Sequence, residues 1–266
     1  TLRGDGLAAE RSPFAAHASG YLTRRLNSSW RELETDGQHR YDAALYWRFL
    51  YDVYGDIEMV RVALQEMARH YNHDILIGLE PAMDATFARM DGPFADFQDS
   101  LIAFSRANYG LRLENGRCAE SSPRECAGRY FDPKQMYEHP VLETHIQYDG
   151  FGRTYKGSVP SSYGTDLLEV GLDLRTQGQS LTVYFQGVGD VARFSVQVWR
   201  LKWGEQRPRA ITAQPEILVQ EADGAYVYHI PAVDTAAYDR LGLIITRLDN
   251  NESEDPVGAY QLTIGL

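Results

Sequence analysis

Three side chains that could bind a metal ion lie within one short segment. The sequence His139-x3-Glu143-x-His145 offers two imidazoles and a carboxylate. Ligands of these types suit zinc and other divalent transition metals. The segment leads from a loop into an expected strand, which supplies no preformed geometry, so the alternative is three ordinary polar residues.

A second group of oxygen-bearing side chains occupies the loop Asp249-Asn-Asn-Glu-Ser-Glu-Asp255. Asp249, Asn251 and Asp255 are candidate calcium ligands because hard cations prefer carboxylate and amide oxygens. The loop lacks the ordered ligand spacing and the central glycine of an EF-hand. A structural turn between the last two strands is the competing interpretation.

A further candidate lies near the start of the sequence, where Asp5 precedes Gly6-Leu7-Ala8. Its carboxylate could bind zinc, or it could cap a helix by accepting hydrogen bonds from free backbone N–H groups. The chain contains no His-Glu-x-x-His and no Gly-x-Ser-x-Gly, the motifs of zinc and serine hydrolases. We therefore assign no catalytic residue, and the chain alone requires no cofactor.

The chain has two cysteines, Cys118 and Cys126, in a polar loop rich in Ser, Pro and Gly. Their spacing is too wide for a typical zinc pair, and a local disulfide is the preferred interpretation. Disulfides persist in oxidising compartments, which favours an extracellular or cell-surface location.

Composition excludes two classes of partner. The formal net charge is -11 without a basic run, which argues against nucleic acid because such partners are held by clustered Lys and Arg. No apolar stretch approaches the roughly 18 to 20 residues needed to cross a bilayer. We expect no transmembrane segment.

Helical periodicity dominates residues 1–112. A helix is predicted over Tyr41–Tyr54, with Gly55 as its stop, because aromatic and apolar residues recur every three or four positions. Two further helices and a last one before residue 112 follow from similar stripes. The predicted core-facing stripes are Ala44, Trp47, Leu50 or Tyr51, Tyr54; Val60, Leu64, Met67, Tyr71; Ile75, Leu79, Met83, Phe87; and Phe94, Phe97, Leu101, Phe104, Asn108.

Periodicity is lost over residues 113–142, a connector held by the cysteine pair. Residues 143–266 contain short alternating runs separated by turn signals, which indicate an antiparallel, jelly-roll-like β-sandwich. The predicted fold class is α+β with two domains, a helical bundle followed by the sandwich.

Two regions carry a resemblance to a known family. Asp5-Gly6-Leu7-Ala8 is similar to the Glu-Gly-Leu-Ala that supplies the third zinc ligand in gluzincin-type metallopeptidases, and Tyr41–Gly55 is similar to their aromatic helix. Val159–Val170 with Leu181–Gly187 resembles the accessory sandwich that follows such catalytic domains. The chain thus resembles the C-terminal part of a secreted bacterial gluzincin-like zinc metallopeptidase without its His-Glu-x-x-His half. Asp5 would bind zinc only together with residues upstream of Thr1.

These observations predict a non-catalytic portion of an extracellular metallopeptidase-like protein that serves binding or structural support. Its partner would be a protein, a glycan, another copy of the chain or an upstream peptidase segment. One alternative is a cell-surface or filament-forming structural protein with a degenerate peptidase-derived fold. Another is a carbohydrate-binding module, with Trp199, Trp203, Tyr226 and Tyr228 as its aromatic platform.

Overall fold

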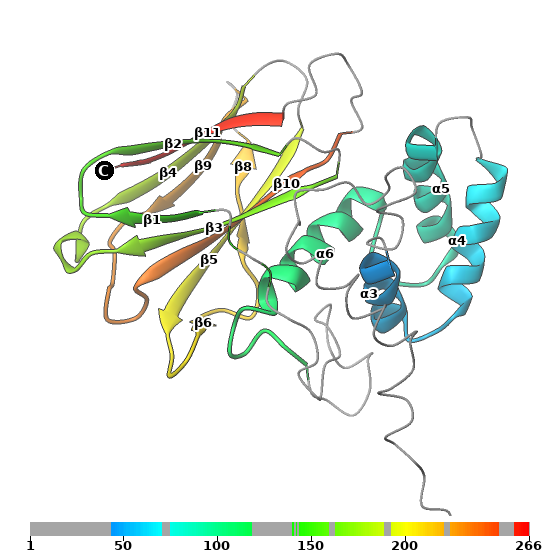
Figure 1. The fold of residues 1–266 in the computed structure, drawn as a ribbon, viewed down its shortest axis with the longest axis horizontal. Helices are drawn as coiled ribbons and strands as arrows, with labels where there is room; N and C mark the ends of the chain where they lie inside the picture. The colour runs from blue at the N-terminus through cyan, green and yellow to red at the C-terminus, as the bar shows by residue number, and fades with distance from the viewer. Residues whose placement is uncertain are drawn as a thin grey trace, which may run out of the picture.

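The computed structural model shows an α+β fold (Figure 1). It describes residues 44–70, 75–118, 140, 142, 144–159, 163–188, 193–220, 224–249 and 258–265. The helix that Asp5 could cap lies outside these ranges.

Four helices form the first layer of the described chain: α3 (Ala44–Tyr54), α4 (Glu58–Arg69), α5 (Ile75–Arg89) and α6 (Phe97–Gly110). The expected stop at Gly55 is confirmed, since this glycine has φ 64°, a left-handed conformation that suits residues without Cβ. α6 begins at an N-cap, where Asp96 Oδ1 accepts a hydrogen bond from Asp99 N at 2.8 Å.

The buried faces of α3 and α4 differ from the predicted stripes. In α3, Leu50 and Tyr54 are buried as predicted, but Leu45, Tyr46 and Phe49 are buried as well, while the predicted Trp47 is only half-buried. In α4 the buried residues are Met59, Val62, Ala63 and Glu66, and Leu64 is 58% exposed. Glu66 can occupy the buried face because Arg69 and Arg89 pair with its carboxylate. Four members of the predicted α6 stripe, Phe97, Leu101, Phe104 and Asn108, are buried, whereas the fifth, Phe94, precedes the helix and is only partly buried.

Two sheets follow the helices. The first has the order β1-β3-β10-β5-β6, with β7 also pairing with β5, and the second has the order β2-β11-β4-β9-β8. The strands of the first sheet are β1 (Thr144–Tyr148), β3 (Thr165–Leu172), β10 (Arg240–Arg247), β5 (Phe194–Trp203), β6 (Pro208–Ala210) and β7 (Glu216–Ile217). The strands of the second are β2 (Arg153–Val159), β11 (Gly258–Gly265), β4 (Leu181–Gly187), β9 (Tyr226–Ile230) and β8 (Val219–Gln220).

The prediction of a wholly antiparallel sandwich is wrong at one pair. β1 runs parallel to β3, with Thr144 opposite Leu168 and Tyr148 opposite Leu172. The reason is that β2, between them in sequence, belongs to the second sheet. The chain therefore leaves the first sheet after β1 and returns to it in the same direction.

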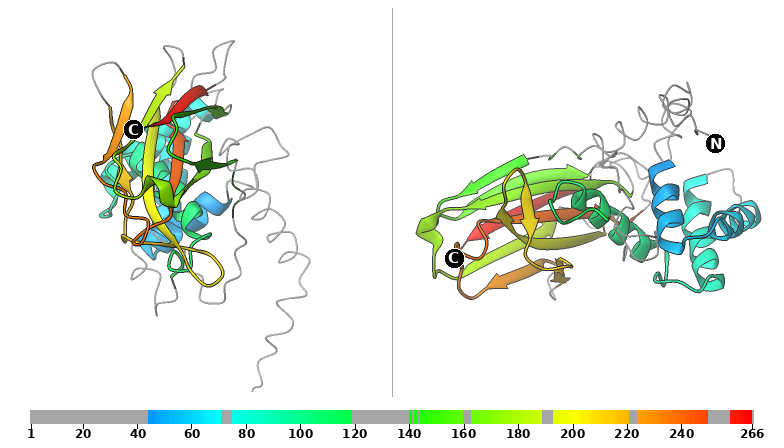
Figure 2. Two further views of the ribbon diagram at one scale, coloured as in Figure 1. Left: turned by 90° about the vertical axis from the view of Figure 1, so that its left-hand side faces the viewer. Right: turned by 90° about the horizontal axis from the view of Figure 1, so that it is seen from below.

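The sheets pack face to face around one apolar core, to which both contribute (Figure 2). Val170, Val198 and Leu243 from the first sheet share this core with Phe185 and Leu262 from the second. Side chains alternate along a strand, so the neighbouring residues of the first sheet point outward.

α6 covers much of that outward face, between the sheet and the other helices (Figures 1 and 2). Ser105 Oγ lies 2.8 Å from Thr165 Oγ1, and Gln197 Nε2 donates to Ile102 O at 3.2 Å. Tyr109 packs with Leu167 and Trp199 in a small apolar cluster. β3 is consequently buried on both faces along its whole length. The boundary predicted at residue 112 falls just after this shared helix, and the division into two domains stays a prediction.

Candidate functional site

A buried carboxylate lies where the C-terminal end of α6 meets the first sheet. Glu169 interrupts the apolar sequence of β3 and is 2% exposed. Its Oε1 accepts hydrogen bonds from Tyr109 Oη and Arg112 Nη2, both at 3.3 Å, and Arg240 Nη1 donates to its Oε2 at 3.1 Å. Two guanidiniums and a phenol therefore compensate the charge that burial would otherwise penalise.

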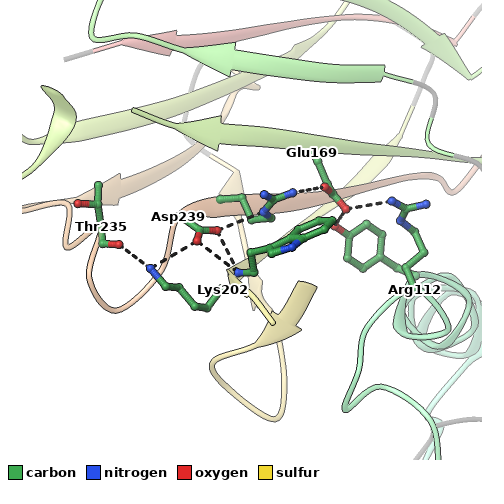
Figure 3. Close-up of polar contacts among 8 residues, drawn as sticks. Arg112, Glu169, Lys202, Thr235 and Asp239 are labelled. Atoms are coloured by element: carbon green, nitrogen blue, oxygen red, sulfur yellow. Dashed lines mark hydrogen bonds and ion pairs between the residues drawn. The ribbon is translucent and has the colours of Figure 1, made fainter. Parts of the chain in front are cut away.

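The network continues along the sheet from Arg240 (Figure 3). Arg240 Nε donates to Asp239 Oδ1 at 3.2 Å, and the same carboxylate accepts from Trp203 N at 3.2 Å. Lys202 Nζ lies 3.4 Å from Asp239 Oδ2 and donates to Thr235 O at 2.9 Å. In Figure 3, Arg112 comes from the turn that follows α6, whereas Glu169 and Lys202 come from the sheet and Asp239 from the turn before β10.

The half-exposed indole of Trp203 packs against this network. The guanidinium carbon of Arg240 lies 4.4 Å from the ring centroid of Trp203, a cation–π stack. Trp203 is nevertheless 50% exposed. We name Arg112, Glu169, Lys202, Trp203, Asp239 and Arg240 the Trp203 surface.

The other three aromatics of the predicted platform are engaged elsewhere. Trp199 is 5% exposed and its Nε1 donates to Thr212 O at 3.0 Å. Tyr228 lies in the sandwich core beside Tyr226. Burial raises the pKa of Tyr228 to about 12, although its hydrogen bond with Arg200 opposes the shift. Of the four residues, Trp203 alone presents an open ring.

The hairpin that carries Trp203 is held by the segment after α6. Glu114 Oε1 accepts from Gln206 N at 3.1 Å and from Arg207 N at 3.3 Å. The hydrogen bond from Gln206 N–H has the largest effect on the pKa of Glu114. Together with the bond from Arg207 N–H it lowers this pKa, although burial opposes the shift. Asn115 Oδ1 accepts from Ala210 N at 2.9 Å on the opposite strand. The hairpin is thus tied to the helical layer.

His145, from the predicted metal group, lies on β1 directly opposite Glu169. Its side chain is on the exposed part of the sheet. His139 and Glu143 lie outside the described residues, and within the described ranges no group of three His, Cys, Asp or Glu side chains could hold a metal. The three-ligand site stays a prediction.

Asp249, from the predicted calcium loop, is bound to protein groups in the structure. Its Oδ1 accepts from Arg247 Nε at 2.9 Å and from Arg247 Nη2 at 2.7 Å, and its Oδ2 accepts from Arg193 N at 2.8 Å. A calcium ion would have to displace Arg247. Asn251 and Asp255 lie outside the described residues, so calcium binding also stays a prediction.

Two further predictions fall at least partly on residues that the structure does not describe. Asp5 lies there, so neither its capping role nor its zinc role is tested. Cys118 is 1% exposed and is not a free thiol, but Cys126 lies outside the described ranges. Their pairing stays a prediction.

Sequence reasoning selected Trp203 and missed Arg112, Glu169 and Arg240. A signal for Glu169 was present in the sequence, since it stands within Leu167-Leu168-Glu169-Val170. A carboxylate inside an apolar strand requires a buried cationic or hydrogen-bonding partner. The identity of that partner depends on strand pairing that brings residues 112, 169 and 240 together.

The Trp203 surface combines a compensated buried charge with a half-exposed indole. Burial raises the pKa of Tyr109, and the charge of Glu169 raises it further. Glu169 is already engaged by three donors, whereas the indole presents an open face. Within the described part of the chain, no helix is long and apolar enough to cross a membrane.

Comparison with known proteins does not place the chain in a family. No family model and no curated protein matches it. Salmonella Typhimurium PliG, a periplasmic inhibitor of g-type lysozyme, is 12% identical with a TM-score of 0.26, over 46% of this chain and 97% of its own. CorA, a surface-associated copper-binding protein of Methylomicrobium album BG8, is 8% identical with a TM-score of 0.28, over 46% of this chain and 99% of its own.

A family GH115 4-O-methyl-α-glucuronidase is 11% identical with a TM-score of 0.22, over 97% of this chain and 39% of its own. Likenesses at this level carry no conclusion about activity or ligand.

Proposed function

We propose that this chain is a non-catalytic binding part of an extracellular protein, and that its ligand contacts the Trp203 surface. The observation that carries the proposal is the half-exposed indole of Trp203, stacked on Arg240. Arg240 is itself fixed by the buried carboxylate of Glu169. The carbohydrate-binding alternative, which rested on four aromatics, now rests on this one.

Preorganisation supports a binding role. The backbone N–H of Trp203 donates to Asp239, and its ring is stacked on a guanidinium that makes ion pairs with Asp239 and Glu169. A side chain already ordered in the free protein loses little conformational entropy when a ligand binds. An exposed aromatic residue held in this way is typical of binding surfaces.

The parent protein belongs to the same proposal. We propose a secreted protein related to gluzincin metallopeptidases, in which this chain forms the helical layer and a jelly-roll-like sandwich after the zinc-binding half. The proposal predicts a His-Glu-x-x-His in the gene upstream of the codon for Thr1. The present chain should show no hydrolysis of peptide substrates with added zinc, and hydrolysis by the purified chain would contradict it.

Binding can be tested by affinity electrophoresis of the whole chain in gels containing soluble polysaccharides. Trp203→Ala should abolish retardation by the ligand. Phe151→Ala removes another aromatic ring, 67% exposed on the β1–β2 turn, and should leave retardation unchanged. Equal retardation of all three proteins would rule out the Trp203 surface as the contact.

A structural subunit is the second candidate. β1 and β2 are the end strands of the two sheets, and an end strand can pair with a strand of another chain. Arg153 and Lys156 on β2 oppose such pairing because exposed charges on end strands discourage it. Sedimentation velocity decides: assembly that grows with protein concentration would favour the structural role.

A further inference from the structure

We infer that the ligand of the Trp203 surface is an oligosaccharide carrying carboxylate groups, a glycan that contains uronic acids. The inference rests on the proposed binding function and adds the chemical class of the ligand. Three properties of the surface support it: the sign of its exposed charge, the hydrogen-bonding capacity of its cations, and the groups that surround the indole.

The exposed charge of the surface is positive, although the chain as a whole carries -11. The side chains of Lys202 and Arg112 are 39% and 22% exposed, and that of Arg240 is 18% exposed. The acid between the arginines, Glu169, is only 3% exposed, and Asp239 is 28% exposed. These residues therefore expose three cations against one partly exposed carboxylate, that of Asp239.

These cations retain donors for a ligand. Lys202 has three N–H groups, and its contacts with Thr235 and Asp239 use two. Arg240 has five, of which one bonds to Asp239 and one to Glu169. Hydrogen bonds from such cations to a carboxylate are stronger than those to neutral oxygens.

The surroundings of the indole favour a sugar over a peptide. Aromatic anchors of protein interfaces fill well-packed, desolvated pockets. Trp203 instead is half exposed, its indole is stacked on the guanidinium of Arg240, and its backbone N–H donates to Asp239. A pyranose ring offers a flat C–H face for the indole and hydroxyl groups at its rim for these neighbours. A carboxylate on that ring would then lie within reach of the cations.

The test compares acidic oligosaccharides with uncharged forms of the same length. Tetramers of galacturonate, glucuronate and mannuronate, each with its methyl ester, are titrated calorimetrically into the whole chain. The ester keeps the sugar skeleton and removes the charge. We expect at least one acid to bind at least about tenfold more tightly than its ester, with affinity that falls as salt concentration rises.

Two variants separate the contribution of the indole of Trp203 from that of the charge of Lys202. Trp203→Ala should weaken acid and ester alike, because both stack on the indole. Lys202→Gln should weaken the acid about threefold or more and leave the ester unchanged. Phe151→Ala and Lys156→Gln remove an exposed ring and an exposed charge elsewhere on the sandwich and should have no effect.

The outcomes separate the inference from the proposed function. Esters that bind as tightly as the acids, with loss in Trp203→Ala, would overturn the carboxylate inference and support the Trp203 surface as a binding site. Preference for the acid that survives both Trp203→Ala and Lys202→Gln would place the site elsewhere and overturn both. Absence of binding by every tetramer would overturn the inference, while retardation by a polysaccharide that depends on Trp203 would still support the function.

Discussion

Tyr163 joins the sandwich to helix α5 through a hydrogen bond from its hydroxyl to Glu80 Oε2, at 3.3 Å. Tyr163 is 1% exposed, and its ring packs edge-on against Phe97 with centroids 5.0 Å apart. Its backbone has φ 58°, the left-handed region that residues with Cβ seldom adopt. Packing around the ring therefore holds a strained backbone in place.

Substitutions at residue 163 separate these contributions. Tyr163→Phe should lower the free energy of unfolding by about 1 kcal/mol, because it removes only the hydrogen bond. Tyr163→Gly should lower it by about 2 to 4 kcal/mol, since loss of a buried ring exceeds the roughly 1 kcal/mol of backbone strain that glycine relieves. Urea denaturation measures both. A glycine variant as stable as the native chain would show that the ring contributes little.

Glu169→Gln tests the buried ion pairs of the Trp203 surface. The amide keeps the shape but removes the carboxylate that pairs with Arg112 and leaves Arg240 paired with Asp239 alone, so we expect a loss of about 3 kcal/mol in the free energy of unfolding. Glu216→Gln is the matched control, because Glu216 also pairs with an arginine, Arg200, but its side chain is 52% exposed. The control should lose less than about 1 kcal/mol. Similar losses in both variants would contradict a special role for burial.

Glu66 should make stability depend on acid pH. Burial alone would raise its pKa, but the hydrogen bond from Arg89 and the charges of Arg69 and Arg89 outweigh this and lower it below the usual 4.5. The folded state then binds fewer protons than the unfolded state, so this contribution is complete above pH 4.5 and is lost as pH falls through the folded pKa. Glu66→Gln should be less stable than the native chain at pH 7, with a gap that narrows as the pH falls below 4.5 in urea titrations. A gap independent of pH would argue against the ion pairs.

Gly242 tests how closely α6 approaches the sheet. A Cβ at this position would collide with the phenol of Tyr109. Gly242→Ala should therefore destabilise the fold by about 1 to 3 kcal/mol, because the helix must move away from β10. Gly265→Ala is the control on β11, where nothing lies within 4 Å of the new methyl group, and thermal denaturation compares the two. Equal unfolding midpoints for the two variants would show that Tyr109 can move away from the new methyl group without loss of stability.

The sequence allowed the α+β class, helix α6 and the Gly55 stop to be predicted, because each depends on local periodicity or backbone chemistry. The predicted buried face of α4 was wrong, since Leu64 was expected in the core and is exposed, whereas Glu66 is buried. Burial of Glu66 depends on its pairs with Arg69 and with Arg89, and the second of these lies on a different helix. The site shows the same limit: Trp203 was visible as an aromatic, but its support depends on Arg112 and Glu169, which are 57 residues apart in sequence.

The position of α6 has a consequence for cooperativity. Its Phe104 belongs to the core of the helices, and its Tyr109 to the cluster on the first sheet. If the other helices separated from the sandwich, α6 could stay with only one of them. It would expose the face with Tyr109 if it stayed with the helices, and the face with Phe104 if it stayed with the sandwich. Intermediates with only one part folded are therefore penalised by loss of apolar burial. Helices and sandwich should unfold in a single transition, so damage to either part is transmitted to the other as lost stability.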